Sequence, residues 1–251
     1  MKNMNIISRN LLVKLAILTL FIGLTGCMSL KPMALKSNAK TVDVSSKSVM
    51  LVTLDVFRSD RSRFVPNPQI ISFERPDATG KPEVLMFKVS GADIEESNNG
   101  HYVYILSMDL EPGQYKLRGV SGDANAFPFH GFFFVPLNMD IQIQKNTVTY
   151  AGRVKAELRP RQENEFRAGS VVPLIDQAVT GVSSGTFDVA VEDLSRTDIP
   201  LFNKTYPALA GTKINTTLLP PFNRPQVQLW WEKDYVSMST VPAVDVAVKA
   251  Q

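Results

Sequence analysis

Apolar and polar residues alternate with a period of two along most of the chain after Val49. The clearest example runs from Thr147 to Arg159, where apolar residues occupy alternate positions and Thr, Lys, Arg and Glu fill most of the positions between them. Successive side chains of a strand point to opposite faces, so this pattern predicts a strand with one buried face and one wet face. The residues expected on the buried face are Val148, Tyr150, Val154, Ala156 and Leu158. Gly152 falls among them and indicates a bulge or a close approach by a neighbour.

Several other segments show the same alternation or a short apolar run bounded by turn residues. They are Met50–Phe57, Gln69–Phe73, Glu83–Val89, Tyr102–Leu110, Gln114–Arg118, Met139–Gln144, Thr186–Glu192 and Gln226–Trp231. Between two of them, Asn98-Asn99-Gly100 is typical of a hairpin tip that joins Glu83–Val89 to Tyr102–Leu110. About nine short strands separated by turns predict a mainly β protein, an antiparallel β-sandwich or a barrel.

One short helix is predicted near residues 198–206. Asp198 can cap it, Pro200 is tolerated in a first turn, and Pro207 ends it. We see no internal repeat and no clean domain boundary after residue 49. We therefore divide the chain into a core over 49–159 and the remaining strands and helix over 160–251, which we expect to belong to the same domain.

The amino terminus has the composition of a secretory signal. Lys2, Arg9 and Lys14 precede an apolar stretch over residues 15–24, and small residues follow it. The run Leu24-Thr25-Gly26-Cys27 resembles the bacterial lipobox. This resemblance implies that residues 1–26 are removed, that the thiol of Cys27 is lipidated, and that palmitate-type acyl chains tether the protein to a membrane. Because no Asp follows Cys27, the resemblance also implies the outer membrane, lipid-anchored and facing the periplasm.

Residues 27–48 are rich in Lys, Ser, Asn and Thr and lack a strong apolar period, so we predict a flexible tether there. The three basic residues of the signal account for the whole excess of 27 Lys+Arg over 24 Asp+Glu. Without them the chain is formally neutral, which argues against a nucleic-acid partner. Cys27 is the one cysteine, so no intramolecular disulfide can form.

A second resemblance lies in the middle of the chain. The run from Leu110 to Leu117 contains Pro112-Gly113 followed by Tyr115, and it resembles the L-x-P-G-x-Y-x-L hairpin of bacterial transthyretin-like and carboxypeptidase-regulatory-like modules. The run from Asn146 to Arg153 resembles the strand that follows in related lipoproteins. Both imply a transthyretin- or Ig-like sandwich in an uncharacterised lipoprotein family. The motif is structural, since Pro112 and Gly113 shape the turn while Tyr115 and Leu117 pack inward.

Few residues are candidates for catalysis or metal binding. Gly181-Val182-Ser183-Ser184-Gly185 matches the G-x-S-x-G nucleophile elbow, but the elbow requires a strand before the Ser and a helix after it, and here we expect a strand to follow. Neither histidine, His101 or His130, has metal ligands at suitable spacing. Asp93, Glu95 and Glu96 form an acidic stretch that fits no calcium-loop template and is expected to be a solvated hairpin tip. Asp193 and Asp198 are explained by helix capping. We therefore expect no catalytic residue, metal or cofactor.

The aromatic residues are the most unusual feature of the chain. Five Phe lie between Phe127 and Phe134, and on a strand they cannot all face one core. We expect Phe132 and Phe134 to be buried and leave Phe133 open, as either a covered residue or an exposed anchor. Trp230 and Trp231 pose the same question. If exposed, Phe133, Trp230 and Trp231 form a surface for a partner or an apolar ligand.

These patterns together favour a lipid-anchored β-sandwich of the cell envelope that acts as a non-enzymatic binding or assembly component. Its expected partners are the membrane, through Cys27, and another envelope protein. One alternative is an envelope hydrolase that acts on lipid or peptidoglycan. Another is an accessory lipoprotein of a secretion machine, which rests on fold-level analogy.

Overall fold

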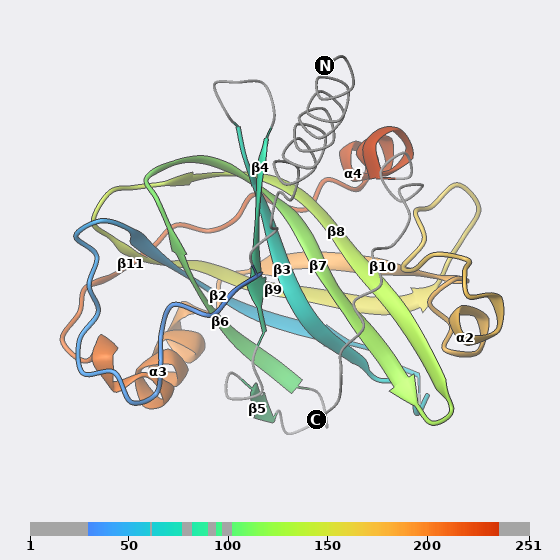
Figure 1. The fold of residues 1–251 in the computed structure, drawn as a ribbon, viewed down its shortest axis with the longest axis horizontal. Helices are drawn as coiled ribbons and strands as arrows, with labels where there is room; N and C mark the ends of the chain where they lie inside the picture. Colours follow the sequence, from blue (N-terminus) through green and yellow to red (C-terminus); the bar gives the residue numbers. More distant parts are fainter. Residues whose placement is uncertain (1–29, 61, 77–81, 90–93, 97–101, 236–251) are drawn as a thin grey trace, which may run out of the picture.

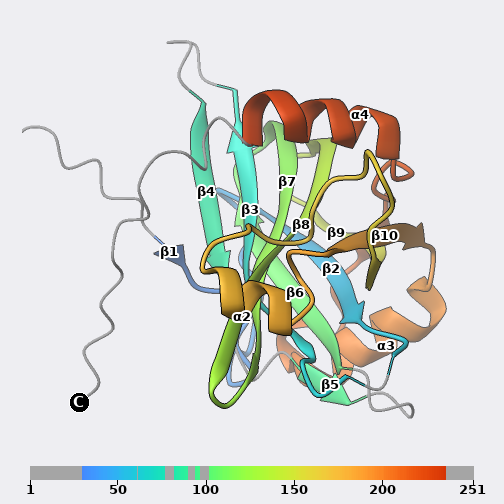
Figure 2. The same cartoon turned by 90° about the vertical axis from the view of Figure 1, so that its right-hand side faces the viewer.

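A computed structural model describes residues 30–60, 62–76, 82–89, 94–96 and 102–235 of the chain, with the backbone alone for 94–96 and 234–235 (Figure 1). These residues form two β-sheets that pack face to face, with short helices around them (Figures 1 and 2). The prediction of a mainly β sandwich is thus confirmed. Cys27, Asp93 and His101 lie outside the described residues.

The first sheet has five strands in the order β1-β4-β3-β7-β8. Their bounds are β1 Leu30–Lys31, β4 Glu83–Lys88, β3 Pro66–Arg75, β7 Gly113–Ala126 and β8 Phe129–Ile143. Strands β7 and β8 form a long antiparallel hairpin, and β8 lies at the edge of the sheet.

The second sheet has the order β10-β9-β2-β6-β5, and a short strand β11 joins β9. Their bounds are β10 Gly185–Glu192, β9 Val148–Pro160, β2 Ser48–Phe57, β6 Tyr102–Leu110, β5 Ile94–Glu96 and β11 Ile214–Thr216. The central pair, β2 and β9, is parallel. The sandwich is therefore mixed and not purely antiparallel as predicted, because the turn after β8 carries the chain from one sheet into the other.

Two predicted hairpins have different partners in the structure. β4 and β6 lie in different sheets, and β6 pairs with β5; Asn98-Asn99-Gly100 lie outside the described residues. Pro112 and Gly113 likewise join β6 of one sheet to β7 of the other. The burial predicted for Tyr115 and Leu117 is confirmed. Turn residues in the sequence mark where the chain reverses but do not say which sheet it enters.

Strand β9 changes face at Gly152. Val154, Ala156 and Leu158 point into the core between the sheets, as predicted. Val148 and Tyr150 belong instead to a second cluster on the outer face of the sheet. Gly152 has a φ of 103°, and the pairing with β2 shifts register between Leu51 and Thr53, beside this glycine. The bulge expected at Gly152 therefore reverses the direction of the side chains before it.

The second cluster explains the helix α3, Ser195–Thr205. This helix packs on β9, with Phe202 buried among Tyr150, Tyr206 and the outer side chains of β2. β2 is thus covered on both faces, and nine of its ten residues are buried.

The described residues contain more helices than the single one predicted. They are α2 Leu174–Val179, α3, a 3-10 turn Pro207–Leu209, α4 Arg224–Trp230 and a π turn Trp231–Tyr235. α2 and α4 both pack against β8 (Figure 2). The strand predicted over Gln226–Trp231 is wrong, because the Asn223 side chain accepts from the Gln226 N–H at 3.1 Å and caps a helix there. None of the helices in the described ranges is long and apolar enough to cross a membrane.

Residues 30–48, which belong to the predicted tether, are attached to the domain in the structure. β1 pairs with β4, and Met33 and Leu35 are buried. The Ala34 N–H donates to the Ser107 carbonyl at 2.7 Å. The few apolar side chains of this Lys/Ser-rich stretch suffice to hold it, although they show no period.

An ion-pair network fixes the chain between β9 and α4. Arg159 contacts Glu165 at 2.6 Å and Asp188 at 2.6 Å, and Arg224 contacts the same Asp188 at 2.6 Å. Hydrogen bonds from Arg159 to both carboxylate oxygens of Glu165 lower the pKa of that carboxyl to about 2. Partly buried, bidentate pairs of this kind contribute more than single surface pairs.

Acid should weaken this network. A folded-state pKa below the unfolded value of 4.5 contributes stability above about pH 4.5, which is lost as the pH falls towards 2. We therefore expect the melting temperature to fall between pH 5 and pH 2 more steeply in the natural protein than in Glu165→Gln. The exposed Glu163 offers a matched control, because Glu163→Gln should keep the natural slope. Identical slopes for Glu165→Gln and the natural protein would contradict this role of Glu165.

Candidate functional site

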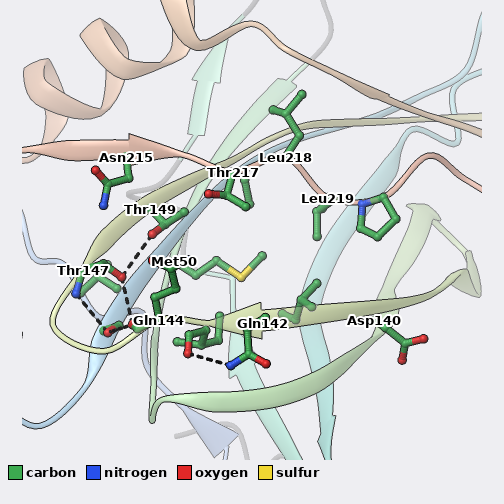
Figure 3. A pocket seen from close by; sticks show the side chains of 16 residues that line it. Met50, Asp140, Gln142, Gln144, Thr147, Thr149, Asn215, Thr217, Leu218 and Leu219 are labelled. Atoms are coloured by element: carbon green, nitrogen blue, oxygen red, sulfur yellow. Dashed lines mark hydrogen bonds between the residues drawn. The ribbon is translucent and has the colours of Figure 1, made fainter.

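A cleft of about 430 Å³ lies between the two sheets and is the candidate site (Figure 3). One side is the end of β8 with the turn after it, from Asp140 to Gln144. The other side is β11 with the extended segment that follows it, from Asn215 to Pro220. Side chains from the first residues of β2 and β9 close the bottom. Elements from four parts of the chain therefore build the cleft.

The cleft has an apolar floor and a neutral polar rim. The floor consists of Met50, Ile141, Ile143, Ala151 and Leu219. Amides and hydroxyls surround it, from Gln142, Gln144, Thr147, Thr149, Asn215 and Thr217 (Figure 3). A largely apolar pocket with a few polar groups at its edge is typical of a ligand-binding site.

Hydrogen bonds fix the turn at one end of the cleft. The buried Ser48 hydroxyl donates to the Gln144 carbonyl at 2.5 Å and accepts from the Thr147 N–H at 3.2 Å. The Thr147 hydroxyl donates to the same carbonyl at 3.0 Å. Asn146 takes the left-handed conformation, with a φ of 59°, which its short amide side chain tolerates. This end of the cleft is therefore preformed.

The cleft carries almost no charge. Asp140 is the one titratable side chain among the residues that line it, and its carboxylate contacts Lys116 at 2.6 Å. No hydrogen bond in the described part of the structure engages the side chains of Gln144, Asn215 or Thr217. These amides and hydroxyl are available to a ligand, and they favour an uncharged one.

The second notable cluster is buried under α3. The Tyr150 hydroxyl donates to an Asp198 carboxylate oxygen at 2.6 Å, and the Arg153 guanidinium forms an ion pair with the same carboxylate. Asp198 is fully buried. Burial, and secondly the bond to Asp198, raise the pKa of Tyr150 above its usual value of 10. The cluster ties α3 to β9, and the complete burial of Asp198 leaves a substrate no access to it.

The predicted capping role of Asp198 is therefore wrong. The helix begins at Ser195, so Asp198 lies inside its first turn and points at β9. Asp193 is not the N-cap either, since that position is Leu194; it lies one residue earlier, and its carboxylate accepts from the Ser195 N–H at 3.0 Å. A hydrogen bond with the Ser195 side chain, and secondly the one from the Ser195 N–H, lower the pKa of Asp193.

The predicted aromatic surface does not exist in the expected form. Phe133 is 3% exposed, and its ring centre lies 5.5 Å from that of Phe187 on β10. Gly122, its partner across the β7–β8 ladder, gives the ring room, because a Cβ at Gly122 would lie 2.6 Å from the Phe133 ring. Phe132, expected to be buried, is 59% exposed beside α2.

Trp230 and Trp231 lie at the end of α4 and cover Phe134. Their ring centres lie 6.3 and 6.2 Å from that of Phe134. Trp231 is buried, and Trp230 is partly buried with Arg118 over its ring. The burial predicted for Phe134 is thus confirmed, that predicted for Phe132 is wrong, and Phe133, which was left open, is covered.

The structure also removes the basis for the nucleophile elbow. α2 precedes Ser183 and β10 follows it, the reverse of the order that the elbow requires. Ser183 is buried, and its N–H donates to the Gln177 carbonyl at 3.1 Å. His130 is exposed on β8, where its backbone N–H donates to Asp176. In the described ranges, no three His, Cys, Asp or Glu side chains gather into a metal site.

Comparisons with known proteins add little to this geometry. No family model matches the chain, and no curated protein matches it. Among solved structures, a "Putative cell adhesion protein" from Parabacteroides distasonis is similar at 10% identity with a TM-score of 0.23. The match covers 58% of this chain and 41% of that chain. A likeness this weak carries no argument about fold or function.

The buried cluster gives a direct test of the role assigned to Asp198. We expect Asp198→Ala to lower the free energy of unfolding by about 3–5 kcal/mol, because the Arg153 charge loses its buried partner. Tyr150→Phe should cost about 1–3 kcal/mol, because the carboxylate loses one donor. Urea denaturation measures both changes. Asp193→Ala is the comparison, and an effect as large as that of Asp198→Ala would contradict this account.

Proposed function

We propose that this protein is anchored by a lipid on Cys27 to the bacterial outer membrane, faces the periplasm, and binds a ligand or another envelope protein in the cleft without catalysing a reaction. The observation that carries the binding role is the lining of the cleft. Unengaged amides and a hydroxyl surround an apolar floor, and Asp140 is already paired with Lys116. General acid–base chemistry needs converging titratable groups, and the described lining does not bring any together.

The anchor is supported by the lipobox and by the way in which the chain after it is held. Because β1 begins at Leu30, only Met28 and Ser29 separate Cys27 from the folded domain. An extended peptide spans at most about 3.6 Å per residue, so the three steps from Cys27 to Leu30 place the Cα of Cys27 within about 11 Å of that of Leu30. We therefore propose that the domain sits against the membrane surface and is not held away from it by a long tether.

The hydrolase alternative is not carried forward. Its one motif, the elbow around Ser183, has the wrong order of elements and a buried serine.

Replacement of Cys27 tests the anchor. We expect Cys27→Ser to abolish labelling by a radioactive fatty acid and to leave the precursor uncleaved, because no other residue can accept the acyl group. Membrane fractionation and mass spectrometry of the amino terminus measure this. A variant that is still processed and still acylated would refute the lipoprotein proposal.

Site-specific crosslinking tests the binding role. We expect a benzophenone amino acid at Thr217, on the wall of the cleft, to form an adduct in cells that make the full chain. At Thr216 it should not, because successive side chains of an extended segment point in opposite directions. Mass spectrometry identifies the adduct. Equal labelling at the two positions, or none at Thr217, would count against ligand binding in the cleft.

A further inference from the structure

Strand β8 lies at the edge of its sheet, so one side of its backbone needs partners from elsewhere. The first half of this edge is covered by its own chain. The N–H groups of His130, Phe132 and Phe134 donate to Asp176, Gln177 and Ala168, respectively, at distances between 2.7 and 3.2 Å. The Gln177 side chain also donates to the Phe132 carbonyl at 3.1 Å. In this half of the edge, the backbone N–H groups of alternate residues therefore all have hydrogen-bond acceptors.

The second half of the edge is open. Beyond Pro136 a bulge at Asn138, whose φ is 49°, shifts the register against β7. From Met139 to Ile143, no strand or loop in the described part of the chain pairs with the side of β8 that faces away from β7. This stretch forms one wall of the cleft. An unprotected strand edge beside a groove is a template for another strand.

The opposite wall is also an extended chain. The N–H of Thr217 donates to the Tyr150 carbonyl at 3.0 Å, and that of Leu219 donates to the Ala151 carbonyl at 2.9 Å. These bonds continue the pairing of β11 with β9. The cleft thus lies between two extended backbones (Figure 3).

A buried acceptor without a donor lies at one end of the cleft. A second cavity of about 100 Å³ shares Asp140 and Pro220 with the main cleft and extends it towards α4. Asn138 lines this cavity and is buried, and its side-chain oxygen has no hydrogen-bond partner in the described structure. A buried acceptor left unsatisfied costs free energy, and a ligand N–H would remove that cost.

We propose that the cleft binds an extended, uncharged peptide segment that adds a strand to β8 along Met139–Ile143. This inference rests on the proposed binding role of the cleft and names the chemistry of the ligand. The open stretch matches about five ligand residues, or about 17 Å of strand. Main-chain bonds to β8 would supply affinity, and the apolar floor would select apolar side chains at alternate positions, as in other cases of strand addition.

Selection from a peptide library tests the proposal. The full chain in detergent micelles is screened against phage that display random heptapeptides. We expect enriched peptides to be uncharged and to carry apolar residues at alternate positions. Thr217→Trp, which fills the cleft, should reduce their affinity at least tenfold, whereas Thr216→Trp should leave it within twofold. Equal melting temperatures of the two variants show that both are folded.

Backbone methylation separates strand addition from simple side-chain binding. N-methyl groups at alternate residues of an enriched peptide remove its donors on one edge and keep its side chains. We expect one of the two methylated registers to bind at least tenfold more weakly than the parent. Equal binding of the parent and both methylated peptides would overturn strand addition.

Two further outcomes would overturn the peptide proposal. One is an enriched set that binds the Thr217→Trp variant equally well, or no enrichment at all. The other is a dimer of the full chain that forms through this cleft and is abolished by Thr217→Trp, since a second copy would then be the occupant. Neither outcome touches the crosslinking result at Thr217, so a failure here is distinguishable from a failure of the binding role.

Discussion

The bulge at Gly152 is the constraint on which most of the structure depends. Strand β9 pairs with β2, β10 and β11, and it serves two hydrophobic clusters that lie on opposite faces of its sheet. A regular strand cannot place Tyr150 under α3 and Leu158 in the inter-sheet core, because both residues have the same parity. The left-handed conformation of Gly152 resolves this conflict. It also sets Ala151 at the floor of the cleft, one residue before the strand turns over.

The sequence pattern is sufficient to predict the class of fold and the positions of many strands. The alternation over Thr147–Arg159 predicts β9 closely, and Gly152 signals its bulge. The pattern does not predict which strands pair with one another. Pro112-Gly113 and Asn98-Asn99-Gly100 indicate turns in the sequence, but whether a turn joins neighbours in one sheet or crosses to the other depends on packing over the whole domain. Asn223 and Pro225 are typical of the start of a helix and indicate α4. The pattern of the residues after them, Gln226–Trp231, favours a strand instead and led to the wrong prediction.

The candidate site could not be predicted, for a physical reason. No residue of the cleft is chemically unusual, and its walls come from β8 and from the segment after β11, which are distant in the chain. The aromatic residues indicate a partner surface in the sequence, yet Phe133 is buried against Phe187 of β10, and Trp231 against Phe134 and Phe166. Nothing in the sequence of β8 itself indicates that part of its edge is open; this depends on which other residues of the chain cover it. Asp176 and Gln177 cover one half, and in the described part of the chain no equivalent side chain covers the other.

Amide hydrogen exchange along β8 tests the central claim, that half of this edge is open, most directly. In the full chain without ligand, the amides of His130, Phe132 and Phe134 should exchange slowly, because each has a partner. Among Met139 to Ile143, the amides that point away from β7 should exchange much faster, because no segment of the described structure pairs with them. Slow exchange at all amides from Met139 to Ile143 would mean that the edge is already paired, and it would contradict the account.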